Sequence, residues 1–216
     1  MTPSASPNFG ARRGGLRPTL VVIHHTGMTS CAAARARLCD PAAEVSAHWL
    51  VSETGAAEAL VPEAMRAWHA GAGSWRGQED INSRSIGIEL ANTGSQPYPE
   101  PQMAALEALL AGIRDRWGIG AAGVIGHSDM APGRKADPGA RFDWRRLARA
   151  GLAVWPEPGP PGDFRADLAA FGYPAAEPAV LLAAFRLRFR PWAAGPLDDT
   201  DRSLAAGLLD AAARGA

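Results

Sequence analysis

The sequence predicts an α/β (α+β) protein with a mixed central β-sheet flanked by helices, followed by a small C-terminal three-helix domain. Within residues 19–152, short apolar strand-like segments are interleaved with helical patterns, which is typical of a helix-covered sheet. Residues 155–162 contain four prolines, and this stretch cannot be a helix or a central strand, because proline removes a backbone donor and fixes φ. We interpret it as part of a linker to three short helices.

The expected strands are short and apolar, and two of them end at a histidine. Leu20 and Val22 share a face with His24, because side chains alternate along a strand, and His24 ends this apolar run. Residues 85–90 also alternate, which places Gly87 and Glu89 on one face and the apolar side chains on the other. Further strands are expected at residues 47–51, 59–61 and 123–127, the last of which ends at His127.

The expected helices follow from apolar residues at three- and four-residue steps. A long helix begins near Pro101, which suits a first turn, and stops at Gly118. Its apolar face consists of Met103, Leu106, Leu110, Ile113 and Trp117. Three shorter helices are expected at residues 164–171, 178–190 and 199–213, the last capped by Asp199 or Thr200.

The chain is therefore divided into four parts. Residues 1–18 are polar and rich in Gly, Pro and Ser, and we expect them to form a flexible N-terminal tail. Residues 19–152 are expected to form the main domain, residues 153–162 the Pro/Gly-rich linker, and residues 163–216 the three-helix domain. A hydrophobic content of 47% over 216 residues is enough for a substantial core.

Composition excludes some functions. The 22 basic residues balance the 22 acidic ones, so no general attraction to nucleic acid is expected. No apolar run is long enough for a membrane span or a signal peptide, which predicts a cytoplasmic protein, with an envelope location left open if the start site is wrong. Cys31 and Cys39 are too few for a disulfide scaffold and are expected to be reduced packing residues. The sequence does not determine the oligomeric state, and we favour a monomer.

Three residues form a candidate metal site. His24 and His127 each end an apolar strand, where a sheet presents its functional edge, and Asp137 follows ten residues after His127. Two imidazoles and one carboxylate leave a divalent metal one open position, as expected of a hydrolytic zinc site rather than a structural one. His25 directly follows His24, and the sequence alone allows either of them to be the ligand.

Glu89 and Lys135 are candidate catalytic residues. A carboxylate on an otherwise apolar strand is costly to bury, so Glu89 is either a general base for the attacking water or a residue on a partly solvated sheet face. Zinc lowers the pKa of water toward ~7, so a nearby carboxylate can complete its activation. Lys135 lies two residues before Asp137 and could stabilise a developing oxyanion, the alternative being an ordinary surface lysine.

Six ordered motifs contain these residues, at positions 22–26, 46–51, 67–71, 85–90, 126–129 and 132–139. Together they resemble the zinc-dependent N-acetylmuramoyl-L-alanine amidases of the amidase_2 family, AmpD/AmiD type. The resemblance covers roughly residues 19–152, and the segment that runs on to Trp75-Arg76-Gly77 is similar to the AmiD type in particular. Residues 163–209 resemble a peptidoglycan-binding three-helix domain.

The resemblance implies that Zn²⁺ is held by His24, which it favours over His25, together with His127 and Asp137. It implies that Glu89 is the catalytic glutamate and that Lys135 is the transition-state lysine. The implied reaction is hydrolysis of the amide between the lactyl group of N-acetylmuramic acid, in the 1,6-anhydro form, and L-alanine of the stem peptide. The partners would be peptidoglycan fragments (muropeptides) in cell-wall recycling or turnover.

The substrate-binding residues predicted from the same motifs are His69, Trp68, Trp75, Arg84 and Asn92. The two tryptophans could instead be core residues, and His48 is expected to be a packed structural histidine. An alternative function is a non-catalytic peptidoglycan-recognition protein of the same fold, but such relatives usually break the ligand set, which is complete here. A third hypothesis keeps a metallohydrolase but changes the amide that it cleaves.

Overall fold

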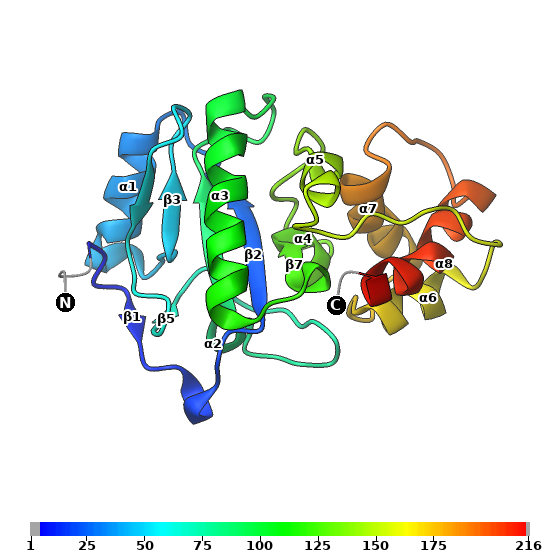
Figure 1. The fold of residues 1–216 in the computed structure, drawn as a ribbon, viewed down its shortest axis with the longest axis horizontal. Coiled ribbons are helices and arrows are strands. Elements are labelled where there is room, and N and C mark those ends of the chain that lie inside the picture. The colour runs from blue at the N-terminus through cyan, green and yellow to red at the C-terminus, as the bar shows by residue number, and fades with distance from the viewer. Residues whose placement is uncertain (1–4, 215–216) are drawn as a thin grey trace.

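The computed structural model describes residues 5–214, which form a five-stranded mixed sheet with helices packed around it (Figure 1). The strand order is β4-β3-β6-β2-β7, in which β4 is an antiparallel edge strand and the other neighbours pair in parallel. The strands are β2 (Leu20–His25), β3 (Trp49–Val51), β4 (Ala57–Ala59), β6 (Ser85–Leu90) and β7 (Val124–Gly126). The predicted fold class is confirmed.

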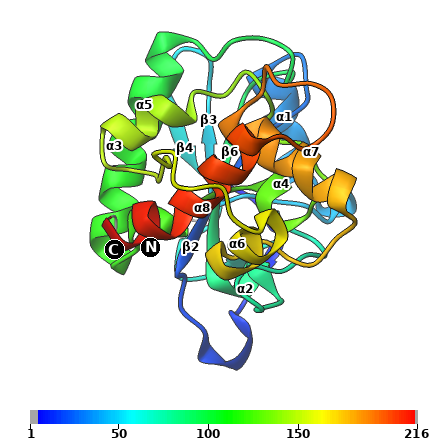
Figure 2. The ribbon, with the colours of Figure 1, turned by 90° about the vertical axis from the view of Figure 1, so that its right-hand side faces the viewer.

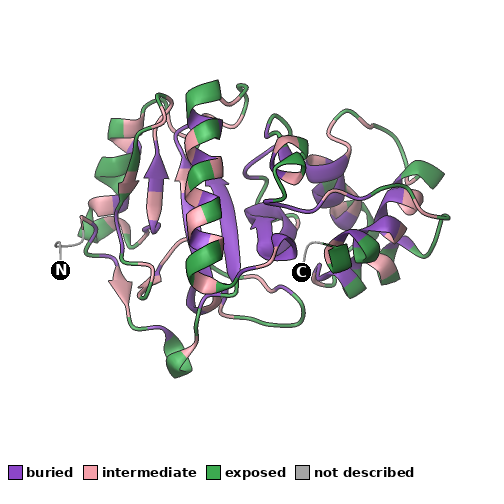
Figure 3. Cartoon of the chain, in the orientation of Figure 1, coloured by how far each residue is buried: buried purple, intermediate pink, exposed green. Residues whose placement is uncertain are grey.

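The central pair β2 and β6 forms the middle of the core. Ile86, Ile88 and Leu90 of β6 lie on one face, as their alternation predicts, and pack with the apolar side of α3 (Glu100–Trp117). Figure 3 shows the buried strands between partly exposed helices. The helix α3 ends where the sequence predicts, because Gly118 adopts a left-handed conformation (φ 67°) and its N–H donates to the Arg114 carbonyl.

Three predicted strands differ in extent from those observed. The strand expected at residues 123–127 is Val124–Gly126, because His127 already begins a helix. The strand expected at residues 47–51 is Trp49–Val51, and the one expected at residues 59–61 is Ala57–Ala59. The turn between them is the reason, because Ser52 N–H donates to the Ala56 carbonyl and Gly55 takes a positive φ of 86°. Pairing with β3 therefore begins immediately after the turn, at Ala57.

Short helices connect the strands and position the loops at their carboxyl ends. These are α1 (Cys31–Cys39), α2 (Ile81–Arg84), α4 (His127–Met130) and α5 (Trp144–Arg149), together with three 3₁₀ turns at Arg13–Gly15, Pro41–Ala43 and Ala121–Gly123. None of the helices in the described part of the chain combines the length and the apolar character needed to cross a membrane.

The predicted flexible tail is corrected by the structure for residues 5–18. β1 (Phe9–Gly10) pairs with β5 (Arg66–Ala67), and Ser6 Oγ donates to the buried Leu38 carbonyl at 2.6 Å. Arg12 is 8% exposed and donates to the carbonyls of residues 82, 83 and 85. This segment is polar because its side chains satisfy buried backbone groups, which composition alone does not distinguish from a solvated tail. Residues 1–4 of the predicted tail lie outside the described residues.

The three predicted C-terminal helices are present as α6 (Phe164–Phe171), α7 (Pro178–Phe189) and α8 (Asp199–Arg214). They lie beyond β7, against α4 and the open side of the sheet (Figures 1 and 2). Val22 and Ile125 of the sheet belong to the same hydrophobic cluster as Phe171 and Phe185 of these helices. The helices and the sheet therefore share one core, rather than two cores separated by the linker.

Candidate metal centre and active site

The candidate ligands meet at the carboxyl ends of parallel strands. His24 lies at the end of β2, and His127 follows directly after β7, the strand that pairs with β2. Glu89 on β6 is the direct partner of His24 on the other side of β2. Because neighbouring strands lie ~4.8 Å apart, these side chains converge at one edge of the sheet. Such edges are the usual ligand sites of open α/β sheets.

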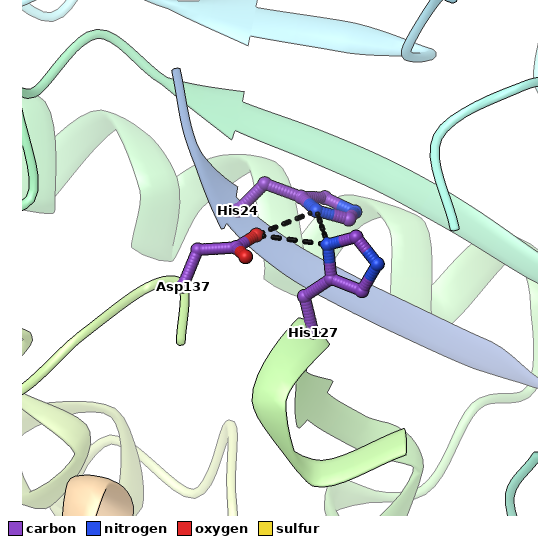
Figure 4. Close-up of side chains that lie close together, drawn as sticks. All are labelled: His24, His127 and Asp137. Atoms are coloured by element: carbon purple, nitrogen blue, oxygen red, sulfur yellow. Dashed lines mark hydrogen bonds and ion pairs between the residues drawn. The ribbon is translucent and has the colours of Figure 1, made fainter. Parts of the chain in front are cut away.

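Asp137 completes a compact triangle of ligand atoms (Figure 4). His24 Nδ1 lies 2.9 Å from His127 Nδ1 and 2.9 Å from Asp137 Oδ2, and His127 Nδ1 lies 3.0 Å from the same oxygen. Zinc bonds of about 2.0–2.1 Å in a tetrahedron separate ligand atoms by about 3.3 Å. The triangle is therefore close to the size that one metal ion requires, and its two nitrogens and one oxygen are suitable donors.

The tautomer of His127 is set by its other ring nitrogen. His127 Nε2 lies 2.8 Å from the Ala70 carbonyl, which can only accept, so Nε2 carries the proton. The lone pair is then on Nδ1, which faces His24 and Asp137. Such an outer hydrogen bond orients a metal-ligating imidazole and raises its basicity. Arg134 Nη2 donates to the same carbonyl at 2.6 Å and so helps to fix its position.

The tautomer of His24 is set by a chain of three hydrogen bonds that ends at a backbone carbonyl. Ser85 Oγ donates to the Ile81 carbonyl at 2.6 Å, so it accepts from His69 Nε2–H at 3.2 Å. His69 Nδ1 then accepts from His24 Nε2–H at 3.0 Å. Since a carbonyl only accepts, the direction of every bond follows, and the lone pair of His24 is on Nδ1. Both imidazoles thus present lone pairs to the same point.

Burial of the site favours the neutral form of His24, which is the form that binds a cation. Desolvation, followed by the facing His127, lowers the pKa of His24 to about 4, so this imidazole is neutral at pH 7. Asp137 places a carboxylate oxygen 2.9 Å and 3.0 Å from the Nδ1 atoms of His24 and His127, which carry the lone pairs. A neutral imidazole and an ionised carboxylate are the forms that bind a metal.

Glu89 lies beside this triangle as an incompletely paired carboxyl group. Among the described residues, its buried Oε2 has no hydrogen-bond partner. Desolvation, and then repulsion from Asp137, raises its pKa to about 8. A metal cation at the neighbouring site would lower that pKa again, since bound cations are the largest local charges in such sites. A carboxyl group with a raised pKa is typical of functional sites.

The metal triangle opens into a cleft of about 340 Å³. Glu89, Lys135 and Trp68 line this cleft with the candidate ligands, as does Arg37 of α1. Lys135 is exposed on the loop before Asp137, so its ammonium group is available to a substrate in the cleft. Arg37 was not among the residues predicted from the sequence. Nothing local marks it, because α1 buries only Ala34 and Leu38 and has no strong amphipathic pattern.

Three predicted substrate-binding residues do not line the cleft. Trp75 is 1% exposed, and its ring packs edge-on against Phe171 and Tyr173 in the core shared with the C-terminal helices. Arg84 is the last residue of α2, directly before β6 and so at the opposite end of that strand from Glu89, and it donates to the Glu79 carbonyl. Asn92 is buried and uses its side-chain amide to hold the loop that follows β6, donating to two carbonyls and accepting from Gly94 N–H.

The structure gives the other three histidines, His69, His48 and His25, different surroundings and therefore different roles. His69 lines the cleft, but its ring nitrogens are used by His24 and Ser85, which makes it a support for the ligand rather than a group directed at substrate. His48 is fully buried, with Nδ1 accepting from Gly87 N–H and Nε2 near the Met65 carbonyl. His25 is outside the three-residue metal cluster, and strand parity turns it away from His24.

A candidate three-residue metal site that opens into a cleft beside a carboxylate of raised pKa and a lysine is typical of metal-dependent hydrolases of the α/β class. Residues 14–140 match the amidase_2 family, described as N-acetylmuramoyl-L-alanine amidase, and the chain belongs to this family.

Relatives of known activity support the same assignment along most of the chain. The N-acetylmuramoyl-L-alanine amidase AmiD of Escherichia coli is 34% identical over 90% of this chain and 83% of its own length. The 1,6-anhydro-N-acetylmuramyl-L-alanine amidase AmpD of E. coli is 35% identical over 66% of this chain and 87% of its own length. The chain is thus an N-acetylmuramoyl-L-alanine amidase, as the sequence motifs predicted.

Solved structures extend the similarity to the C-terminal helices. The complex of E. coli AmiD with anhydro-N-acetylmuramic acid-L-Ala-D-γ-Glu-L-Lys matches with a TM-score of 0.82 at 34% identity, covering 93% of this chain and 91% of that one. AmpDh3 of Pseudomonas aeruginosa matches with a TM-score of 0.81 at 28% identity, covering 97% and 98% of the two chains. The three C-terminal helices are therefore part of the compared fold.

Proposed function

We propose that this chain is a zinc-dependent amidase that cleaves the bond between the lactyl group of 1,6-anhydro-N-acetylmuramic acid and L-alanine of the stem peptide. The observation that carries the proposal is the open His24–His127–Asp137 triangle with Glu89 beside it in the cleft. The anhydro-sugar substrate is suggested by AmpD and by the ligand in the AmiD complex, both similar to this chain.

Zinc is the metal that best suits this donor set. Two imidazole nitrogens and one carboxylate oxygen form a borderline-soft set, and three protein ligands leave a fourth position open for chemistry. When bound, zinc supplies Lewis acidity that polarises the amide carbonyl and makes water at the site more acidic. The outer hydrogen bonds of His24 and His127 are those expected of imidazoles that hold such an ion.

The residues of the chain perform the proton transfers and the charge stabilisation. Glu89 accepts a proton from the attacking water as the new C–O bond forms at the amide carbon. Lys135 places its positive charge where negative charge develops on the carbonyl oxygen. Glu89 then returns the proton to the departing nitrogen as the C–N bond breaks. The products are the lactyl carboxylate of the sugar and the free amino group of L-alanine.

The cleft accommodates the reacting part of such a substrate. A volume of about 340 Å³ lies at the small end of the range for ligand pockets, which is ~300–1,000 Å³. We infer that it encloses the lactyl-alanine amide and its neighbours. Trp68 offers an apolar wall, and Arg37 offers a positive charge suited to a carboxylate of the stem peptide.

Mass spectrometry of the zinc-loaded protein incubated with anhydro-muropeptide tests the proposal, with intact sacculi as a second substrate. Release of free stem peptide from the small substrate alone supports a recycling amidase. Cleavage of sacculi as well indicates a role on the polymeric wall. No cleavage of either substrate, with one zinc per chain, would instead support the non-catalytic recognition protein. The cytoplasmic location expected from the sequence stays a prediction.

A further inference from the structure

The C-terminal helices contact the helix that carries His127 through a buried ion pair. Arg188 on α7 places Nη1 2.6 Å from Asp129 Oδ2 on α4. Both side chains are enclosed, with Arg188 2% exposed and Asp129 0% exposed. The two residues are 59 positions apart, so this contact joins the C-terminal helices directly to the segment that follows β7. Figure 2 shows α7 beside α4.

Asp129 receives two further hydrogen bonds that fix the start of α4. Its Oδ1 accepts from the Tyr173 hydroxyl at 2.6 Å, a second contact from the C-terminal region. Its Oδ2 also accepts from Gly126 N–H at 2.8 Å. Because the Gly126 bond closes the first turn of α4, the position of Asp129 determines where the backbone places His127, the first residue of that helix.

The same helix also holds the third ligand. Ser128 N–H donates to the Asp137 backbone carbonyl at 3.0 Å, so the loop that carries Asp137 is tied to α4. A displacement of α4 therefore moves two of the three candidate ligands, His127 and Asp137, relative to His24 on β2. Metal and catalytic sites depend on ligand positions held to within about 0.5 Å.

The guanidinium of Arg188 is held in place by several contacts, so its ion pair restrains the position of Asp129. Its guanidinium lies over the ring of Trp144, 4.1 Å from the centroid, and Nη2 lies 3.3 Å from the Val124 carbonyl on β7. These contacts come from the sheet and from α5, whereas the backbone of Arg188 belongs to α7. A planar, stacked arginine with a short carboxylate contact loses little further freedom when it forms the pair.

We propose that Arg188 is a positioning residue for the metal centre, so that the C-terminal helices complete the site by holding α4 through Asp129. The inference rests on the proposed metal function, but it concerns a residue outside positions 14–140, the part of the chain that matches the family. It assigns the C-terminal helices a role in the amidase reaction itself, separate from any binding of the cell wall.

The test compares two variants of the full-length chain, Arg188→Met and Arg186→Met. Arg186 lies two residues earlier on α7 and forms a buried ion pair of the same kind, with Nη2 2.5 Å from Asp201 Oδ2. Asp201 is on α8 and 0% exposed, so this control removes a buried arginine–aspartate pair of the same helix without touching α4, although Asp201 also pairs with Arg190. Each variant is measured for zinc affinity by chelator competition, for melting temperature with and without zinc, and for kcat and KM at saturating zinc.

Arg188→Met should melt at lower temperature, by on the order of 10 °C, because it leaves the buried Asp129 without its arginine. Arg186→Met should also melt at lower temperature, but by less, because Asp201 keeps its ion pair with Arg190 at 2.6 Å. Only Arg188→Met should also bind zinc more weakly, by about 10-fold, the lower end of what outer-sphere partners cost when removed. At saturating zinc its kcat should fall while KM changes little, since the ligands are misplaced but the cleft is intact. Equal zinc affinities in Arg188→Met and Arg186→Met would overturn the proposal.

A milder variant keeps the proposal testable if Arg188→Met does not fold. Tyr173→Phe removes only the hydroxyl that donates to Asp129 and keeps the ring against Trp75. We expect a loss of zinc affinity of about threefold, below the ~10-fold of a full outer-sphere partner. An unchanged zinc affinity in a folded Tyr173→Phe protein would count against the role of Asp129. If the unmodified chain binds no zinc at all, the proposed function fails, and that outcome is distinct from zinc binding that is indifferent to Arg188.

Discussion

Replacing Glu89 with glutamine separates its catalytic role from its structural one. Glutamine has nearly the shape of a protonated glutamate, and the pKa of Glu89, raised to about 8 by burial, means that the metal-free protein carries this group mostly protonated at pH 7. The exchange should therefore leave the fold and the zinc content unchanged. What glutamine cannot do is accept a proton from the attacking water.

The expected kinetic loss follows from that single missing function. General-base catalysis contributes ~10²–10⁴ to the rate, which corresponds to about 2.7–5.4 kcal/mol of activation free energy. We expect kcat of Glu89→Gln for anhydro-muropeptide to fall by at least ~10², measured by chromatography of the released stem peptide. Glu63→Gln is the control, because Glu63 is bonded to Trp49, Trp117 and Arg116 away from the cleft and should affect stability but not turnover.

The pH dependence of stability gives an independent check. A pKa raised from 4.5 to about 8 in the folded state means that the protonated carboxyl stabilises the fold below pH 4.5, and that this contribution is lost as the pH rises through about 8. Zinc-free Glu89→Gln should therefore equal the unmodified protein only below about pH 4.5, and exceed its melting temperature increasingly as the pH rises from 4.5 to about 8. If Glu89→Gln with full zinc occupancy keeps more than about a tenth of the original kcat, well short of a ~10² loss, Glu89 is not the base.

Three further predictions address the rest of the site. Lys135→Met should lower kcat by roughly 10²-fold, as the loss of an oxyanion donor does. Its melting temperature should not change, because Lys135 is exposed. An unaltered kcat would mean that Lys135 is an ordinary surface lysine. Gly87→Ala places a Cβ 2.4 Å from the His69 ring, so it should displace the support of His24 and weaken zinc binding by ~10–100-fold in chelator competition. Because a bound cation would lower the pKa of Glu89 from about 8, zinc binding should release a proton below that pH, and zinc affinity measured across pH should weaken as the pH falls from about 8, whereas an affinity that does not change there would contradict this coupling.

The local pattern of the sequence was sufficient to predict the faces of the central strands. Alternation in residues 85–90 put Glu89 opposite the apolar side chains, and the structure places it on the face of β6 that adjoins His24. Parity also separated His24 from His25 on β2. The alternation of side chains along a strand is a property of the backbone itself, so it does not depend on what surrounds the strand. The helices α3, α6 and α7 were predictable for the same reason, from a period of 3.6.

Assignments that depend on contacts between distant segments could not be made in this way. Trp75 lies in a motif close to cleft residues, yet its ring is buried against Phe171 and Tyr173, almost one hundred positions later. Polar composition predicted a flexible tail, but the side chains of residues 6–12 satisfy carbonyls contributed by other parts of the chain. Composition reports the presence of donors and not the acceptors that they meet.

The sequence by itself determined the fold class, the order of the motifs, and the residues able to bind a metal and to accept a proton. These follow from residue type and from short-range periodicity, which the backbone imposes locally. Only the tertiary structure decided that His69 and Ser85 orient His24, and that Arg188 forms an ion pair with Asp129 on the helix that begins at His127. Such roles depend on distances between side chains on different elements, and those distances exist only once the sheet and the C-terminal helices have packed into one core.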